Sequence, residues 1–135
     1  MEYKLLVVDD DDEDFMLLAT RFNECRHKVN LVHISDTEEL IQFIETGVLP
    51  DLVIVDARMP LIDGYELVTR LRNSSVWRRV PIIVWTGSVS DEENVRLYEA
   101  GANSVILKQD TLEQVQAFCQ YWFGLVRLPT VVHDV

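Results

Sequence analysis

The feature that most constrains the fold is a set of apolar runs that each end in a charged residue. Residues 5–8 (LLVV) precede four aspartates, residues 52–55 (LVIV) precede Asp56, and residues 105–107 (VIL) precede Lys108. A short apolar run followed at once by a charge is typical of a buried parallel strand that ends at the carboxyl edge of a sheet. Ligands of open α/β sheets bind at that edge. The sequence therefore predicts that several carboxylates and one lysine share a crevice.

Strand and helix patterns alternate along the chain. The predicted strands are residues 3–8, 29–34, 52–55, 82–85 and 104–107. The predicted helices run from 11 or 12 to about 26, from 36 or 37 to the glycine at 47, from 65 to 71, from 91 to 100 and from 111 to about 123. Strands joined through helices pair in parallel with right-handed crossovers. The pattern predicts an α/β fold, a doubly wound five-stranded parallel sheet with helices on both faces.

Local signals set the predicted helix ends and faces. Asp11 or Asp12 can cap the first helix. Thr111, followed three residues later by Gln114, resembles a capping box that would begin the last helix. The second helix is expected to face the core with the apolar residues at its helical spacing, Leu40, Ile41 and Ile44.

Length and charge restrict the class of protein. The chain has 135 residues, enough for one domain with a sizeable core. It carries 23 acidic against 12 basic residues, a net charge of −11, whereas nucleic acids and anionic membranes attract lysine and arginine. We expect no nucleic-acid partner and no membrane association. The absence of a signal peptide or long apolar span favours a cytoplasmic location.

Cysteine and histidine give no sign of metal or redox chemistry. Cys25 and Cys119 are in no CxxC pattern, and each falls in a predicted helix, which favours packed thiols. His27, His33 and His133 have no metal-ligand spacing and are interpreted as surface residues without an assigned role.

The end of the chain is apolar but has no helical pattern. The predicted domain covers residues 1–123, followed by a tail, residues 124–135, and no separate effector domain is expected. The tail fits a strap packed on the domain and an extension that binds a partner equally well. Its apolar residues are Leu125, Val126, Leu128, Val131 and Val132.

Clustered carboxylates at one sheet edge repel one another unless a cation lies among them. Asp9 and Asp10 follow the first strand directly and can reach a metal, although a run of aspartates is also typical of a solvated face. Asp11 and Asp12 are better placed to start the helix, where acids meet the positive end of its dipole. Mg²⁺ takes one or two carboxylates together with waters and phosphate oxygens. The pattern therefore favours Mg²⁺.

Asp56, Thr86 and Lys108 suggest phosphoryl chemistry at the same edge. A carboxylate beside a cation can attack phosphorus and form an acyl phosphate. A lysine ammonium and a threonine hydroxyl can both bind the oxygens of the resulting group. Taken singly, a helix-capping aspartate, a hydroxyl in a turn and a solvated lysine are equally ordinary interpretations.

In their order and spacing these residues resemble the receiver domain of two-component response regulators (CheY-like domains). The resemblance covers residues 3 to about 123 and implies a flavodoxin-like sheet of order 2-1-3-4-5. The end of the chain, Tyr121-Trp122-Phe123 and then Leu128-Pro129, is similar to the stand-alone branch that partners bacterial phytochromes and other sensor kinases. The motifs that carry the resemblance are Val8-Asp9-Asp10, Val55-Asp56, Met59-Pro60, Asp63-Gly64, Thr86-Gly87 and Lys108.

The resemblance implies a role for each motif residue. Asp56 would accept a phosphoryl group from a phosphohistidine on a sensor histidine kinase or phosphotransfer protein, in a Mg²⁺-dependent reaction. Thr86 and Lys108 would contact that group, and the side chains of Arg58 and Ser88 would tune its gain and loss. The chain would act as an enzyme only in its own phosphorylation and dephosphorylation. The implied metal ligands are the carboxylates of Asp10 and Asp56 and the backbone carbonyl of Arg58, with Asp9 binding the metal directly or through a water.

The chain departs from the family pattern at two positions. Gln109 follows Lys108 where the family usually has proline, often after a cis peptide bond, and a cis bond before glutamine would cost about 2.5–4 kcal/mol. Val105 stands where an aromatic switch residue is common. The usual coupling between the threonine and that aromatic residue is therefore expected to be muted or rerouted.

The resemblance also implies an output surface. Phosphorylation would draw Thr86 toward the phosphate and reshape the face built from the fourth helix, the fifth strand and the fifth helix. Self-association as a homodimer, through this face or through the tail, is a further hypothesis. Ordinary packing is the alternative interpretation of the candidate face residues, Val105, Tyr98, Phe118 and Tyr121.

Two other functions fit parts of the pattern. A receiver-like module that binds partners without being phosphorylated is compatible with Val105 and Gln109. A Mg²⁺-dependent phosphohydrolase with an aspartyl nucleophile would usually carry a second acid two residues after the nucleophile, where this chain has Arg58, and a cap for which the chain has no spare length.

Overall fold

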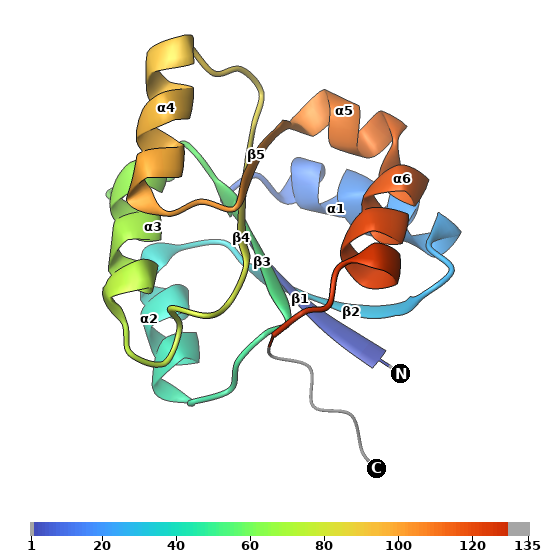
Figure 1. Ribbon diagram of the computed structural model, residues 1–135, viewed down its shortest axis with the longest axis horizontal. Coiled ribbons are helices and arrows are strands. Elements are labelled where there is room, and N and C mark those ends of the chain that lie inside the picture. The colour runs from blue at the N-terminus through green and yellow to red at the C-terminus, as the bar shows by residue number, and fades with distance from the viewer. Residues whose placement is uncertain (1, 130–135) are drawn as a thin grey trace.

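The computed structural model describes residues 2–129, and this part of the chain forms an all-parallel sheet of order β2-β1-β3-β4-β5 between two layers of helices (Figure 1). The predicted α/β fold and its strand order are confirmed. The strands are β1 (Glu2–Val8), β2 (Lys28–Ile34), β3 (Leu52–Asp56), β4 (Ile82–Thr86) and β5 (Ser104–Leu107). The helices are α1 (Asp12–Arg21), α2 (Thr37–Glu45), α3 (Gly64–Asn73), α4 (Asp91–Ala100), α5 (Lys108–Glu113) and α6 (Val115–Cys119).

Strand register brings the chemically important residues to one edge of the sheet. Val8 pairs with Val55, Val55 pairs with Val84, and Val84 pairs with Val105. The residues that follow these valines therefore emerge together at the carboxyl ends of four adjacent strands. The predicted crevice is thus a consequence of parallel pairing.

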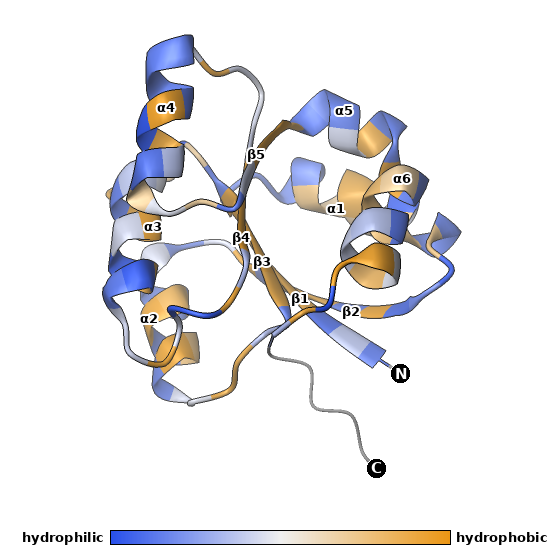
Figure 2. Ribbon diagram, viewed as in Figure 1, coloured by the Kyte–Doolittle hydropathy of each residue, from blue (hydrophilic) through white to orange (hydrophobic). Residues whose placement is uncertain are grey.

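The sheet is apolar on both faces because each face is covered by helices (Figure 2). Alternate residues of β1 and β3 face opposite sides: Leu6 and Val8 pack with α2, α3 and α4, whereas Leu5 and Val7 pack with α1 and α6. Every residue of β3 and β4 is buried. The core therefore holds the strand ends in a fixed geometry.

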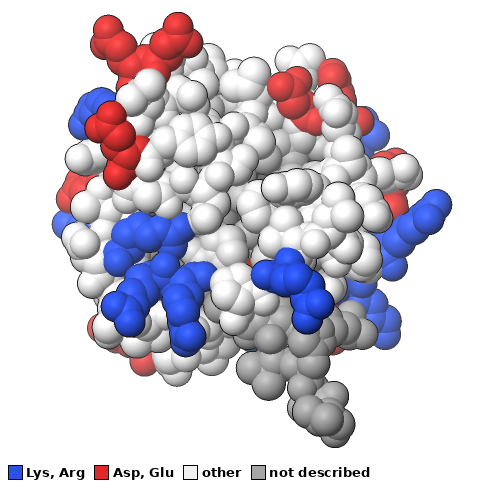
Figure 3. Space-filling view, viewed as in Figure 1, with Lys and Arg blue, Asp and Glu red and all other residues white. Residues whose placement is uncertain are grey.

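Side-chain caps begin the helices that flank the edge. Asp11 accepts a hydrogen bond from the backbone N–H of Asp14 at 3.1 Å, as predicted, and Asp36 and Asp63 cap α2 and α3 in the same way. Ser90 caps α4. Acidic side chains gather over the first turn of α4 (Figure 3), where they meet the positive end of the helix dipole.

Two predictions about helix faces and starts are wrong. Ile41 is 47% exposed, because the buried stripe of α2 passes through Leu40 and Ile44 and position 41 falls outside it. Thr111 does not begin the last helix: α5 starts at Lys108, directly after β5. The Thr111 hydroxyl is buried and donates to the backbone carbonyl of Leu107 at 3.0 Å, so it acts inside the helix.

Helix ends also differ from the prediction. The first helix ends at Arg21 and continues as a 3-10 turn (Phe22–Glu24), short of residue 26. The last helical region divides at Gln114, whose φ of −124° is not helical, and finishes as a π-helix (Gln120–Leu125). The residues described contain no cis peptide bond, so the bond before Gln109 is trans, as expected.

The described part of the tail packs on the domain. The Val126 N–H donates to the carbonyl of Tyr121 at 2.9 Å, and Leu128 is buried in the core on the side of α1 and α6. Leu125 is 68% exposed. Val131, Val132 and His133 lie outside the described residues. Within residues 2–129 no helix has the length and apolar character needed to cross a bilayer.

Replacing Gly64 with alanine tests the tight contact at the start of α3. A Cβ at this position would lie 2.8 Å from the Cα of Ala57 and 3.2 Å from its carbonyl oxygen, both backbone atoms that cannot move aside. We expect Gly64→Ala to lower the free energy of unfolding by about 1–3 kcal/mol in urea denaturation. Gly87→Ala is the control, since nothing lies within 4 Å of its Cβ. Equal stabilities of the two variants would contradict this contact.

Candidate functional site

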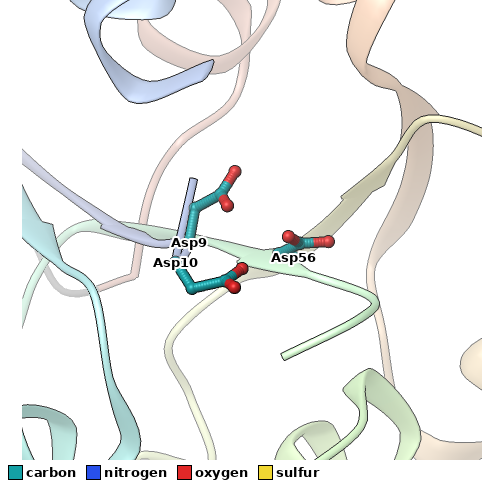
Figure 4. A group of neighbouring side chains, drawn as sticks. All are labelled: Asp9, Asp10 and Asp56. Atoms are coloured by element: carbon teal, nitrogen blue, oxygen red, sulfur yellow. The ribbon is translucent and has the colours of Figure 1, made fainter. Parts of the chain in front are cut away.

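Carboxylates from the ends of β1 and β3 meet at the edge of the sheet (Figure 4). Ligand oxygens of Asp9, Asp10 and Asp56 all lie within 4.8 Å of one another. Asp9 is fully buried and Asp56 is 6% exposed, whereas Asp10 is exposed. This arrangement of oxygen ligands with one open side suits a hard cation that keeps part of its water shell.

Lys108 lies against two of these carboxylates. Its ammonium nitrogen is 3.0 Å from Asp9 Oδ2, 3.4 Å from Asp56 Oδ2 and 2.6 Å from Asp14 Oδ2. Burial lowers the pKa of Lys108, but the hydrogen bonds to Asp14 and Asp9 and the charge of Asp56 outweigh burial and raise it. Lys108 is therefore a firmly charged group fixed over Asp56.

Asp9 is held in an unfavourable electrostatic position. Burial raises the pKa of Asp9, and so does the nearby charge of Asp56, while the backbone N–H of Asp11 and the ammonium of Lys108 lower it. The net pKa is above the ordinary value of 3.8. Burial of Asp9 and the charge of Asp56 thus outweigh the hydrogen bonds from Asp11 and Lys108, and a further cation at this edge would favour the charged form of Asp9.

The backbone after Asp56 folds back on the site. The Arg58 N–H donates to Asp56 Oδ1 at 3.0 Å, and the Gly64 N–H donates to the carbonyl of Ala57 at 2.9 Å. An isolated bridge joins Arg58 to Asp63. These bonds orient the carboxylate of Asp56 and keep the backbone of Arg58 beside it.

Thr86 is present at the edge, but its hydroxyl is already engaged. The hydroxyl is buried, donates to the carbonyl of Ser88 at 2.8 Å and accepts from Arg58 Nη1 at 3.1 Å. Arg58 Nη1 also lies 3.1 Å from the Ser88 carbonyl, and Arg58 Nη2 lies 3.6 Å from Glu93 Oε2. The residues expected to tune the rates therefore form one connected group with Thr86.

The predicted switch residues fall into two kinds. Val105 is half-buried, and its N–H donates to the hydroxyl of Tyr98 at 3.1 Å. Tyr98 and Tyr121 are 46% and 52% exposed and are open to contact. Phe118 is 8% exposed and packs edge-on against Phe22, which agrees with ordinary packing. A role for Phe118 in a contact face stays a prediction.

Sequence reasoning missed two residues that hold this site in place. Asp14 lies in the first turn of α1, which Asp11 caps, and its carboxylate contacts the ammonium of Lys108 at the start of α5. His33, to which no role was assigned, stacks on Phe15 with ring centroids 4.1 Å apart and lies 2.8 Å, through Nε2, from the carbonyl of Asp9. The spacing of Asp14 from its cap could have indicated its orientation, whereas the contact of His33 depends on the pairing of β1 with β2.

Comparison with known families decides which class of protein this geometry belongs to. The family model of the response regulator receiver domain matches residues 5–120. The chain belongs to this family. The expectation drawn from the motifs at the strand ends is confirmed.

Curated relatives of this receiver domain include short and long proteins. It is 28% identical over 134 residues to the probable methanogenesis regulatory protein FilR2 of Methanothrix harundinacea, covering 93% of this chain and 86% of that protein. It is 24% identical to the response regulator Rcp1 of Synechocystis, covering 93% and 92%. The transcriptional regulatory protein PhoP of Bacillus subtilis is 32% identical over 117 residues. That match covers 87% of this chain but only 47% of PhoP.

Solved structures of response regulators share this fold. The phosphorylated cyanobacterial phytochrome response regulator RcpA superposes with a TM-score of 0.86, at 19% identity, covering 96% of this chain and all of that one. The red-light response regulator RPA3017 of R. palustris superposes with a TM-score of 0.81, at 25% identity, covering 96% and 99%. The Mn²⁺-bound form of Rcp1 has a TM-score of 0.85 at 23% identity, covering 95% and 99%. The branch suggested by the end of the chain is thus consistent with these neighbours.

Metal binding should depend on Asp10, the carboxylate that opens to solvent. We expect Mg²⁺ to raise the thermal midpoint of the wild type, by an amount equivalent to about 2.7 kcal/mol at one hundred times its dissociation constant. Asp10→Asn should lose most of this Mg²⁺-dependent rise in scanning calorimetry. Asp12→Asn removes an equal charge from the first turn of α1, outside the carboxylate group, and should keep it. A similar loss in both variants would show that the effect is general electrostatics.

The ammonium of Lys108 should stabilise the metal-free protein in a pH-dependent way. Its pKa in the folded state lies above the ordinary 10.5, so its contribution is complete below pH 10.5 and is lost as the pH rises beyond that value. We expect Lys108→Met to cost about 2–4 kcal/mol near neutral pH. Urea unfolding between about pH 8 and about pH 11 should show this cost shrinking at the alkaline end. Lys28→Met, on the exposed part of β2, is the control, and a cost independent of pH for Lys108→Met would contradict the assignment.

Proposed function

We propose that this receiver domain accepts a phosphoryl group on Asp56 and thereby switches its contacts with other proteins. The donor is a phosphohistidine of a sensor histidine kinase or phosphotransfer protein. The observation that carries the proposal is the ammonium of Lys108, held between Asp9 and Asp56 at the edge where Asp10 adds a third carboxylate. A buried carboxylate with a fixed cation on one side and metal ligands on the other is arranged for attack on phosphorus.

The donor set fits Mg²⁺. Its ligands would be the carboxylates of Asp10 and Asp56 and the backbone carbonyl of Arg58, with Asp9 binding directly or through a water and further waters completing the shell. When bound, Mg²⁺ would neutralise charge on the transferred oxygens. The carboxylate oxygens of Asp9, Asp10 and Asp56, which lie within 4.8 Å of one another, support this assignment. The pKa of Asp9 is raised mainly by its burial, and a cation beside it would favour the charged form.

The transfer itself exchanges one bond for another at phosphorus. An oxygen of Asp56 forms the new bond to phosphorus, the bond from phosphorus to the donor's imidazole nitrogen breaks, and the electron pair stays on that nitrogen. The N–H of Arg58 holds Oδ1 of Asp56, which fixes the direction of the carboxylate. Lys108 then has an ammonium within reach of the arriving oxygens, so charge is stabilised without a large movement of the chain.

Loss of the phosphoryl group is also expected to occur at this site. We expect no turnover of a separate substrate, so the protein is proposed to act only on its own phosphoryl group. The partner is proposed from similarity. Rcp1 and RcpA, to which this chain is similar, are named response regulators, and RcpA is named as that of a cyanobacterial phytochrome. A sensor kinase is therefore the partner proposed for this chain. Homodimer formation and a cytoplasmic location stay predictions.

The two alternative functions each meet an obstacle. A phosphohydrolase would use an acid at position 58, where the structure has an arginine whose guanidinium is bonded to Thr86 and Ser88. A phosphorylation-independent module would not need Asp9, Asp10 and Asp56 gathered around Lys108. The gathered acid set therefore favours phosphorylation over both.

Intact mass measurement after incubation with Mg²⁺ and a small-molecule acyl phosphate tests the proposal. We expect the wild type to gain one phosphoryl group and Asp56→Asn to gain none, because the nucleophilic oxygen is lost. Asp110→Asn, an exposed acid on α5, is the matched control and should be modified like the wild type.

Two outcomes would contradict the proposal. Modification of Asp56→Asn at the wild-type rate would place the reactive group elsewhere. A wild type that stays unmodified with several donors, while Mg²⁺ still stabilises it, would favour the phosphorylation-independent module.

A further inference from the structure

Arg58 joins the phosphorylation site to the start of α4. Its backbone N–H donates to Asp56 Oδ1, its Nη1 lies 3.1 Å from both the Thr86 hydroxyl and the Ser88 carbonyl, and its Nη2 lies 3.6 Å from Glu93 Oε2. Arg58 itself lies in the loop after β3, and its side chain touches the end of β4, the carbonyl of Ser88 and the first turn of α4. Lys108, by contrast, contacts carboxylates from β1, α1 and β3.

The hydroxyl of Thr86 has two mutually exclusive uses for its one proton. In this structure it donates to the carbonyl of Ser88 at 2.8 Å. To donate to a phosphoryl oxygen on Asp56, it must release that carbonyl, because a hydroxyl carries one hydrogen. Arg58 Nη1 already lies against the same carbonyl and can keep it satisfied after Thr86 leaves. When Thr86 moves, the Ser88 carbonyl therefore keeps its hydrogen bond from Arg58 and loses the one from Thr86.

Glu93 forms the ion pair with Arg58 Nη2 and also takes part in the N-terminal cap of α4. Ser90 caps the helix by accepting from the N–H of Glu93 at 3.1 Å, and its hydroxyl donates to Glu93 Oε1 at 3.3 Å. Glu93 thus bonds back to the helix cap through the Ser90 hydroxyl, and Arg58 binds the remaining oxygen of its carboxylate. Any shift of the guanidinium thus acts on the residues that set the first turn of α4.

We propose that Arg58 and Glu93 couple phosphorylation of Asp56 to the position of α4 in this protein. The proposal rests on the proposed function and names its regulation. The two-state element is the Thr86 hydroxyl, bonded either to Ser88 or to the phosphoryl group, and the Arg58–Glu93 ion pair transmits the choice. Arg58 is a positioning residue here, acting through Thr86 and Glu93.

The connection through Arg58 matters because position 105 holds valine and not an aromatic residue. Val105 packs in the core on the side of α2, α3 and α4 and offers no aromatic ring that could follow Thr86. Tyr98 is tied to β5 through the N–H of Val105 and is 46% exposed. The contacts of Arg58 therefore supply a connection between the end of β4 and α4 that the β5 position does not.

The ion pair between Arg58 and Glu93 is weak and sensitive to salt because both side chains are exposed. The first turn of α4 carries Asp91, Glu92 and Glu93, so the acids there attract the guanidinium collectively. The side chains of Arg58 and Glu93 are 55% and 48% exposed. An ion pair at this exposure changes an equilibrium by up to about fivefold and weakens with added salt. The coupling should therefore be measurable and depend on ionic strength.

Glu93→Gln isolates the charge of the pair. Glutamine can keep the contact with the helix cap, since its amide oxygen can accept from the Ser90 hydroxyl as the carboxylate oxygen does. Glu92→Gln removes the same charge from the same turn of α4. Within the described residues, the ion pair of Arg58 with this turn is made to Glu93 and not to Glu92. The two variants therefore have equal net charge and an equal change in helix-dipole interaction.

Two readouts on the same samples separate occupancy of the site from its transmission. Mg²⁺ and beryllofluoride serve as the phosphoryl mimic. Fluorescence of Trp85, a fully buried residue whose ring lies 5.2 Å from the ammonium of Lys108, reports occupancy. Hydrogen–deuterium exchange of the segment 91–97 reports the response of α4.

We expect all three proteins to show the Trp85 change at similar ligand concentration. The ligand-dependent change in exchange of α4 should fall about twofold or more in Glu93→Gln and stay at the wild-type level in Glu92→Gln. Raising the ionic strength to about 1 M should lower the wild-type response toward that of Glu93→Gln.

Each contrary result has a distinct meaning. An unchanged α4 response in Glu93→Gln, with a normal Trp85 signal, overturns the coupling and leaves the proposed function standing. Equal losses in Glu92→Gln and Glu93→Gln also overturn it, because they assign the effect to general charge. Absence of any Trp85 change in the wild type contradicts the proposed function itself.

Discussion

The arrangement of this domain depends on one ammonium group placed among carboxylates that would otherwise repel one another. Lys108 lies 3.0 Å from Asp9 and 3.4 Å from Asp56, at the ends of strands that are buried on both faces. The core fixes the strand ends, so the carboxylates cannot separate to relieve their repulsion. The pKa of Asp9 is raised, mainly by its burial and further by the charge of Asp56. A cation and a phosphoryl group are the chemical partners that such an edge can accept.

The same edge is connected to the helices through Arg58. Asp56 is oriented by the N–H of Arg58, whose side chain in turn contacts Thr86 and Glu93. A new group on Asp56 therefore competes for bonds that already hold the loops after β3 and β4. Energy of the order of a single hydrogen bond or exposed ion pair, about 1 kcal/mol, is enough to change the population of two closely balanced arrangements several-fold.

Most of the fold and of the candidate site could be predicted because both follow from strand ends. Apolar runs of strand length followed by a charge give parallel order and place Asp9, Asp56 and Lys108 together, without knowledge of the helices. What could not be predicted depends on contacts between elements. The start of α5 at Lys108 and the reach of Asp14 to its ammonium arise from packing across the sheet edge, which local capping patterns do not encode.

A structure determined with Mg²⁺ and beryllofluoride bound would test the central claim most directly. The account predicts beryllium on a carboxylate oxygen of Asp56, the metal on Asp10, Asp56 and the carbonyl of Arg58, with Asp9 binding it directly or through a water, and fluorine atoms in contact with Lys108 and Thr86. The Thr86 hydroxyl would have left the carbonyl of Ser88, to which it donates at 2.8 Å in the present structure. Beryllofluoride bound elsewhere, or an ordered complex in which Lys108 does not contact it, would contradict the account.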